Sequence, residues 1–342
     1  MQNIIEKIKL EFLPTKPQNN SSNRLLYIDV LKILAAFLTV FYHFAYYELD
    51  YGFIEGQAYY PNINRIVMCF ASCCVPLFFL VNGSLMLKTD RRIKPLYFKI
   101  AKIVLLIALW SWSGFPSWFF KTLCILYFLM PVFKLVIKNK KTHYITCIAV
   151  FIFPFLYNFI VFLIKLWGIS EISAFGITLP IGIFTRTGFF TLYSILYFLL
   201  GPILKNLKNT NIIIDVSLIT LGLFLVVWEC VGYTNIDNQM FDGVNASFPT
   251  IGALFLSVGL YLLIKKGSYI RFSKVLSFLG SGALTIYLTH SLFIKLFYSI
   301  ATQQLKISLI LSLAASALIC LIAAFIGKIA SKIPVVCWFF KI

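Results

Sequence analysis

The chain has 342 residues, of which 60% are hydrophobic and only 12% carry a charge. Soluble domains contain roughly twice that share of charged residues, so the composition excludes an ordinary soluble protein and favours one with many membrane-spanning helices. The net charge of +18 is compatible with nucleic-acid binding, but the placement of the charges along the chain indicates a membrane topology signal instead.

Residues 1–23 are polar and end in the run PTKPQNNSSN. They lack the apolar core and the small-residue cleavage site of a secretory signal peptide, so we predict a cytoplasmic arm that is not removed. We expect residues 24–333 to form a single transmembrane domain and residues 334–342 to form a short cytoplasmic tail.

Ten apolar segments of about 18–25 residues occupy this domain, and each is long enough to cross a hydrocarbon core of about 30 Å. The sequence therefore predicts an all-α, polytopic bundle of about ten transmembrane helices. The segments are, in chain order, 26–47, 63–87, 97–114, 117–137, 143–164, 186–204, 211–231, 246–264, 275–298 and 307–330.

Lysine and arginine are distributed unevenly between the connections of these segments. If the N-terminus is cytoplasmic, most of the 30 basic residues fall on the cytoplasmic side, as the positive-inside pattern requires. The acidic residues favour the opposite side, at Glu48, Asp50, Glu55, Glu171, Glu229, Asp237 and Asp242. We therefore predict that both termini are cytoplasmic.

The first apolar segment carries three ionisable residues, Asp29, Lys32 and His43. Each costs about 2.5–3.5 kcal/mol on insertion scales, so such residues rarely occur in a span without a function. Spacings of 3, 11 and 14 residues return to nearly the same face of a helix. The three side chains therefore form one polar stripe roughly 20 Å long, which could line a path into the membrane.

Two of the three histidines lie at a similar predicted depth. His43 and His290 are each about 15–17 residues from the cytoplasmic start of their helix, which places both in the outer half of the membrane. They could share a cavity in which a neutral imidazole accepts a proton from an alcohol, or they could form helix–helix hydrogen bonds. Either Glu48 or Asp29 could assist His43. His143 is expected to be an interfacial residue at the start of the fifth segment.

A basic cluster, KTDRRIKPLYFKIAKI, follows the second segment. A positive-inside loop explains part of it. Lys99 and Lys102 are three residues apart and share one helical face. Together with Arg91, Arg92 and Lys32, they would suit a polyanionic ligand such as coenzyme A, whose phosphates attract positive charge.

The sequence predicts no metal site. Its eight cysteines show neither a CxxC pair nor a Cys/His spacing typical of zinc, so we expect them to be buried apolar residues.

Several stretches resemble the acyltransferase-3 family, membrane O-acyltransferases that modify bacterial cell-surface glycans. YIDVLKILAAFLTVFYH resembles the first helix of the family, in which an acidic and a basic residue precede a histidine. VPLFFLVNGSLML resembles a second motif, with Asn82 where serine is usual. Lys99 and Lys102 stand where the family usually has two arginines. LGSGALTIYLTHSLFI resembles a late motif, and SWFFKTLCILYFLMPVF resembles the Trp-rich fourth helix.

The resemblance implies an O-acetyltransferase of the bacterial inner membrane. The implied donor is cytoplasmic acetyl-CoA, and the implied acceptor is a lipid-linked or periplasmic saccharide, as in the enterobacterial-common-antigen and O-antigen O-acetyltransferases. His43 would be the general base, and a covalent acetyl-histidine is an alternative route. The further catalytic candidates are Lys32, Asp29 and His290. The residues that would bind coenzyme A are Lys99, Lys102, Arg91, Arg92 and Lys32.

Two other functions remain open from the residues alone. A transporter or flippase of a lipid-linked sugar would also have about ten helices and buried charges, and a non-catalytic partner of an envelope assembly would need no reactive histidine. The outer loops, at about 165–186 and 229–247, hold aromatic residues that could stack on sugars or lie at the membrane interface. These aromatic residues are Trp167, Trp228, Tyr233 and Phe241.

Overall fold

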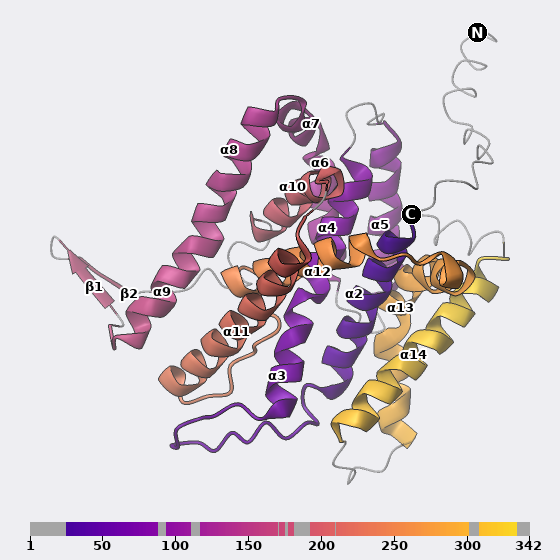
Figure 1. The fold of residues 1–342 in the computed structure, drawn as a ribbon. Helices are drawn as coiled ribbons and strands as arrows, with labels where there is room; N and C mark the ends of the chain where they lie inside the picture. Colours follow the sequence, from indigo (N-terminus) through magenta and orange to yellow (C-terminus); the bar gives the residue numbers. More distant parts are fainter. Residues whose placement is uncertain are drawn as a thin grey trace.

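The computed structural model describes residues 25–87, 94–110, 117–169, 171–174, 177–180, 192–208, 210–300 and 308–333. Most of these residues lie in helices (Figure 1), so the predicted all-α class is confirmed. The expected arm at 1–23, the tail at 334–342, and Arg91 and Arg92 lie outside the described residues.

The helices follow the predicted segments in order. They are α2 (Leu26–Ala45), α3 (Ile63–Phe70), α4 (Cys74–Met86), α5 (Lys94–Trp110), α6 (Trp118–Phe128), α7 (Met130–Lys138), α8 (Lys140–Phe151), α9 (Tyr157–Leu166), α10 (Leu192–Asn206), α11 (Ile212–Asp237), α12 (Ile251–Lys266), α13 (Ser273–Ile300) and α14 (Leu309–Ala330). Short turns of other helix types join α3 to α4 (Ala71–Cys73), join α8 to α9 (Ile152–Leu156) and precede α13 (Ile270–Phe272).

Each of the ten predicted segments overlaps a helix, but fewer helices are long enough to cross a membrane. In the described part of the chain six helical stretches meet that length and composition, or seven if α6 and α7 form one broken span. The helices α5, α10 and α12 have only 17, 15 and 16 residues. The protein is therefore a multi-pass membrane protein with six or seven candidate spans, and ten full crossings remain a prediction.

Two prolines account for interruptions that the hydrophobic pattern did not reveal. The predicted segment 117–137 is split into α6 and α7, which meet at an angle of 57°. Pro131 lies in the first turn of α7, where proline is tolerated but cannot continue a preceding helix. Pro154 lies in the π-helical turn between α8 and α9, as expected when a proline removes one backbone donor from a long helix.

A small β-hairpin was not predicted from the sequence. Strands β1 (Glu171–Ala174) and β2 (Ile177–Pro180) pair antiparallel, with Glu171 opposite Pro180 and Ala174 opposite Ile177. The hairpin follows α9 and extends away from the helices (Figure 1). Four-residue strands give too short a pattern to be distinguished from a loop in advance.

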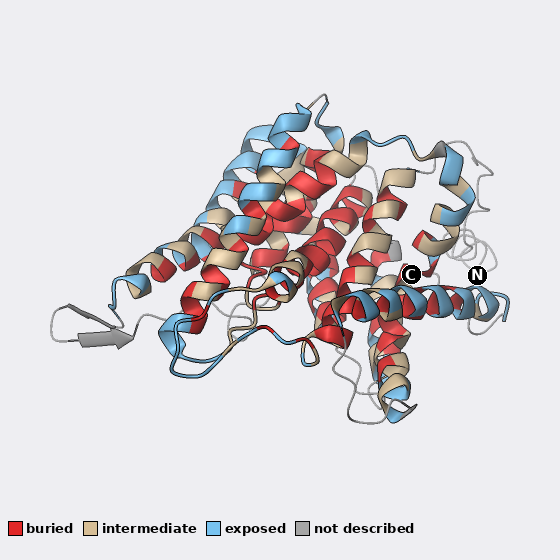
Figure 2. Cartoon of the chain, turned by 60° about the horizontal axis from the view of Figure 1, so that its bottom comes forward, coloured by how far each residue is buried: buried red, intermediate tan, exposed pale blue. Residues whose placement is uncertain are grey.

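The centre of the bundle is formed by α2, α3 and α4. Of the most apolar window in the α3–α4 span, 78% is buried inside the protein, compared with 22% for α11. Buried residues run through the middle of the molecule, and the outer helices carry most of the exposed ones (Figure 2). The exposed positions include Ile213 and Ile310, which are 68% and 80% accessible. Such apolar surfaces are expected where a helix faces lipid.

In two pairs of helices, the two partners pack closely against each other at glycines. A Cβ atom on Gly83 of α4 would overlap the backbone carbonyl of Phe198 in α10, and one on Gly201 of α10 would overlap that of Leu80. The α11–α12 pair is similar, because a Cβ atom on Gly252 would lie 2.7 Å from the backbone nitrogen of Val226. Small residues at such contacts let backbones pack closely inside a membrane, where burial in lipid gives little driving force.

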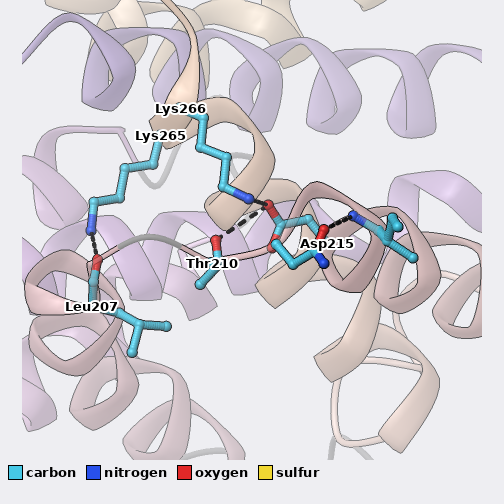
Figure 3. A network of polar contacts seen from close by, with 7 residues as sticks. Leu207, Thr210, Asp215, Lys265 and Lys266 are labelled. Atoms are coloured by element: carbon cyan, nitrogen blue, oxygen red, sulfur yellow. Dashed lines mark hydrogen bonds and ion pairs between the residues drawn. The ribbon is translucent and has the colours of Figure 1, made fainter.

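Lysines gather at one end of the bundle, which we call the basic end. There α4, α10 and α12 end and α8 and α11 begin. The Lys265 ammonium donates to the carbonyls of Leu204 and Leu207, at 2.8 and 2.7 Å, and so caps the last turn of α10. Lys266 pairs with the buried carboxylate of Asp215 (Figure 3).

The opposite, acidic end is formed by the connections 46–62 and 238–250. These connections carry Glu48, Asp50, Glu55 and Asp242. They are joined through Gly56, whose N–H donates to the side chain of Asn238 at 2.8 Å. The N–H of Tyr59 donates to the side chain of Asn235, in α11, at 2.7 Å. The basic and acidic connections that differ in the sequence thus lie at opposite ends of the bundle. The direction in which the bundle is inserted remains a prediction.

Candidate active site

Two candidate catalytic residues of the first segment, Asp29 and His43, lie along the interface between α2 and α13. Asp29, near the basic end, is buried against α13, because a Cβ atom on Gly280 would lie 2.6 Å from its Cβ and Oδ1 atoms. Glycine at position 280 therefore leaves the space that the Asp29 side chain occupies. His43 lies on the same helix about 21 Å further along its axis, so Asp29 and His43 do not belong to one reaction centre.

The structure brings His43 and His290 together near the acidic end. The centroids of the two imidazole rings are 5.2 Å apart, and their planes are tilted by 31°. His290 in α13 is only 1% accessible, whereas His43 in α2 is half-buried. The similar depth expected for the two histidines thus places them side by side, with His43 as the more accessible of the two.

The backbone fixes which nitrogen of His290 carries the proton. Its Nδ1 lies 2.6 Å from the carbonyl oxygen of Tyr287. A carbonyl oxygen can only accept, so in the neutral imidazole Nδ1 carries the hydrogen and Nε2 keeps a lone pair. Nε2 is buried and has no hydrogen-bond partner in the part of the chain that the structure describes. A buried acceptor of this kind is costly unless a donor reaches it.

Tyr287 is the centre of an aromatic cluster that joins three of the sequence motifs. Its ring centroid lies 5.1 Å from that of Phe119 and 5.3 Å from that of Phe120, both in α6. It lies 6.1 Å from the ring of Phe78 in α4 and 5.6 Å from that of His290. The VPLFF, SWFF and late motifs therefore meet beside the histidine pair.

Asn82, which stands where the family usually has serine, links α4 to α6. Its Oδ1 accepts a hydrogen bond from the Tyr127 hydroxyl at 3.1 Å, and its Nδ2 donates to the carbonyl of Phe78 at 2.8 Å. An amide provides both an acceptor and a donor at this place, so Asn82 has a structural role next to the cluster.

A carboxylate that sequence reasoning missed lies beside the catalytic helix. The hydroxyl of Tyr42 donates to Oδ2 of Asp242 at 2.9 Å. Asn245 also hydrogen-bonds to this oxygen, at 2.9 Å, and contacts the Tyr42 hydroxyl. The Tyr42 ring packs against His43, with centroids 4.9 Å apart. Asp242 comes from the distant connection 238–250, and the sequence alone gave no signal that would pair it with α2.

The basic residues expected to hold a phosphate-rich donor lie away from the histidines along the helix axes. Lys32 is half-buried on α2 and Lys99 and Lys102 are half-buried on α5. The far end of α5 is fixed to α13, because Trp110 donates from Nε1 to the carbonyl of Leu288 at 2.9 Å. Lys102 is about 12 Å and Lys99 about 17 Å back along α5 from that contact.

Comparison with known proteins assigns the N-terminal part of the described chain to a family. The model of a family described as an acyltransferase domain, of the acyltransferase-3 type, matches residues 25–117. This stretch includes α2, α3, α4 and α5, and hence Asp29, Lys32, His43, Lys99 and Lys102. His290 lies outside it. Neither a curated protein nor a solved structure matches the chain. Residues 25–117 therefore belong to the acyltransferase-3 family, and the protein is an acyltransferase.

Proposed function

We propose that the protein is an O-acetyltransferase of the bacterial inner membrane. It transfers an acetyl group from cytoplasmic acetyl-CoA to a hydroxyl of a cell-surface or lipid-linked saccharide. The observation that carries this proposal is the pairing of His43 with His290. The pair lies at the acidic end of an α2–α13 interface that begins at the basic end with Asp29.

The donor is proposed to enter from the basic end, which the positive-inside pattern assigns to the cytoplasm. The helix α4 ends there at Met86, and seven residues connect it to Lys94 at the start of α5. Lys99 and Lys102 therefore lie in the part of α5 nearest the basic end. With Arg91, Arg92 and Lys32 they would bind the phosphates of coenzyme A through charge-assisted contacts.

His43 is proposed to act as the general base. One of its nitrogens takes the proton of the sugar hydroxyl while the hydroxyl oxygen attacks the thioester carbonyl. The carbon–sulfur bond then breaks, and the coenzyme A thiolate leaves and takes up the proton from His43. Transfer of the acetyl group first to a nitrogen of His43 and then to the sugar is the alternative route.

His290 is proposed to orient His43. The His290 ring lies beside that of His43, and its Nε2 has no hydrogen-bond partner among the described residues. When substrate is bound, Nε2 of His290 would accept a hydrogen bond from one His43 nitrogen, and the other His43 nitrogen would act as the base. Hydrogen bonds of this kind are often longer without substrate than in the reacting complex.

The acceptor is proposed to approach from the acidic end. There the Tyr42–Asp242 hydrogen bond places the connection 238–250 beside His43. Of the aromatic residues considered for sugar stacking, Trp167 is 82% accessible, whereas Tyr233 and Phe241 stack on each other with centroids 4.7 Å apart. Trp167 is therefore the better candidate for contact with a sugar.

Purified protein incubated with labelled acetyl-CoA tests the proposed function. We expect coenzyme A release that depends on a saccharide acceptor, and loss of O-acetyl groups from surface glycans of cells that lack the gene, measured by mass spectrometry. A carrier would move a sugar without releasing coenzyme A. The match to an acyltransferase domain favours the enzyme over the carrier.

A further inference from the structure

A second candidate binding place lies at the basic end, apart from the α2–α13 interface. It is a cavity of about 530 Å³ between the end of α4, the start of α8 and the end of α10. Its polar lining comprises Ser84, Lys140, His143, Tyr144, Lys205 and Asn206. The volume falls in the range of sites for small molecules. Lys32, Lys99 and Lys102, which are the described residues of the proposed donor site, do not line it.

The charge of the cavity is positive. Two of its lining residues are lysines, and no carboxylate of the described residues lines it. Lys205 donates to the carbonyl of Ser84 at 3.2 Å, which holds one ammonium group at the end of α4. Lys266, at the same end of the bundle, is instead neutralised by Asp215.

The first turn of α8 adds to this charge. The helix begins at Lys140, and the side chain of Asn139 caps it by accepting from the N–H of Lys141 at 2.9 Å. The positive end of the helix dipole therefore lies beside the cavity, where it favours an anion. Nε2 of the buried His143 lies 2.9 Å from the carbonyl of Leu199, which ties α8 to α10 and fixes this wall.

We propose that the cavity binds the phosphate group of an organic phosphate. Ammonium groups and a helix N-terminus are typical partners of phosphate oxygens. The remaining walls include Leu87, Ile137 and Ile203, which can contact an apolar part of the same ligand. The phosphate could be the head group of an anionic membrane lipid or belong to a soluble nucleotide. Either ligand would be additional to coenzyme A, so the inference goes beyond the proposed acetyl transfer.

Binding to the full-length protein in detergent tests the inference, with two probes that distinguish the sources. One is dioctanoyl phosphatidylglycerol and the other is uridine 5′-monophosphate, which is not a part of coenzyme A. The variant Lys140→Glu is compared with Lys141→Glu. Both lysines are exposed and adjacent on α8, and the two variants change the net charge equally, but only Lys140 lines the cavity. Folding of each variant is checked by its melting temperature.

We expect at least one probe to bind wild-type protein and Lys141→Glu with similar dissociation constants. In Lys140→Glu the dissociation constant should rise by about tenfold or more, because one ionic contact is replaced by a repulsive one. Binding of the lipid probe would identify a lipid head group, and binding of uridine 5′-monophosphate would identify a nucleotide. Equal weakening in both variants, or no binding of either probe, would overturn the proposal. Because the readout is binding, it is independent of whether acetyl transfer is detected.

Discussion

The rings of His43 and His290 lie 5.2 Å apart across the α2–α13 interface. They are chemically unequal, since the Tyr287 carbonyl holds the proton of His290 on Nδ1 and His43 is the more accessible ring. A neutral imidazole has one donor and one acceptor. One ring can therefore orient the other, as an acidic residue orients the histidine of a hydrolase triad.

His43→Ala should remove most acetyl transfer, by about 10²–10⁴-fold if His43 is the general base. The substitution leaves no buried charge unpaired, so the protein should remain folded. Acetyl transfer and melting temperature should be measured on the same preparation. A folded variant with a rate near that of wild type would show that the base lies elsewhere.

His290→Asn should reduce the rate less than His43→Ala. The asparagine keeps a side-chain N–H near the position of Nδ1, but it removes the acceptor at Nε2. A hydrogen bond to a group that becomes charged contributes about 1.5–3 kcal/mol, which corresponds to a loss of about 10–100-fold in kcat.

His290→Gln provides the matched comparison for this prediction. Its amide oxygen lies near the position of Nε2 and can accept a hydrogen bond, so activity should partly return. Equal rates for His290→Asn and His290→Gln would indicate that His290 only packs between the helices.

Changing both Lys99 and Lys102 to Gln should raise the dissociation constant of acetyl-CoA. Each lost charge-assisted contact should cost about 1.5–3 kcal/mol. The control is the double change of Lys138 and Lys141 to Gln, which removes two exposed lysines from the same end of the protein. Unchanged affinity in the first variant would mean that these lysines serve only as a topology signal.

Tyr42→Phe should weaken the attachment of the connection 238–250 to α2. Asp242 would keep its contact with Asn245 but lose the hydroxyl of Tyr42, at a cost of about 0.5–1.5 kcal/mol in stability. We expect KM for the acceptor to rise while KM for acetyl-CoA stays constant. Tyr47→Phe is the control, because Tyr47 is 87% accessible. If both KM values rose together in Tyr42→Phe, the link would support the fold and not the acceptor site.

Reporter fusions after Lys138 and Lys266 should indicate the cytoplasm, and fusions near Glu55 and Asp242 should indicate the outside. The prediction follows from the separation of the basic end from the acidic end and from the positive-inside pattern. A cytoplasmic signal at Asp242 would contradict the proposed insertion and, with it, the direction in which the acetyl group moves.

Much of the fold could be predicted from hydrophobic runs, because every predicted segment overlaps a helix. The residues at which helices begin and end were harder to predict from the sequence. The segment expected to begin at residue 246 starts as a helix only at Ile251, since Thr250 accepts a hydrogen bond from the N–H of Ala253 and caps the helix there. An apolar run continues through such a turn without any change in hydrophobicity. For the same reason, hydrophobicity did not predict the break between α6 and α7 at Pro131.

The candidate site could be predicted only where the position of a residue along its own helix determines its place. The position of His43 relative to His290 followed from the number of residues between each histidine and the start of its helix. The contact between Asp242 and Tyr42 depends on how a connection folds back on α2, which no helical period encodes. The burial of Asp29 against Gly280 similarly depends on the register between two helices that are far apart in the sequence.

Direct backbone contact at Gly83 and Gly252 limits how this protein can work. A transporter exposes its substrate alternately to the two sides by rocking or sliding one group of helices against another. At these glycines no side chain separates the backbones of the α4–α10 and α11–α12 pairs, so we expect each pair to move as one body. In the proposed reaction, the thioester arm of the donor would then carry the acetyl group from the basic end toward the acidic end without a movement of α4 against α10 or of α11 against α12.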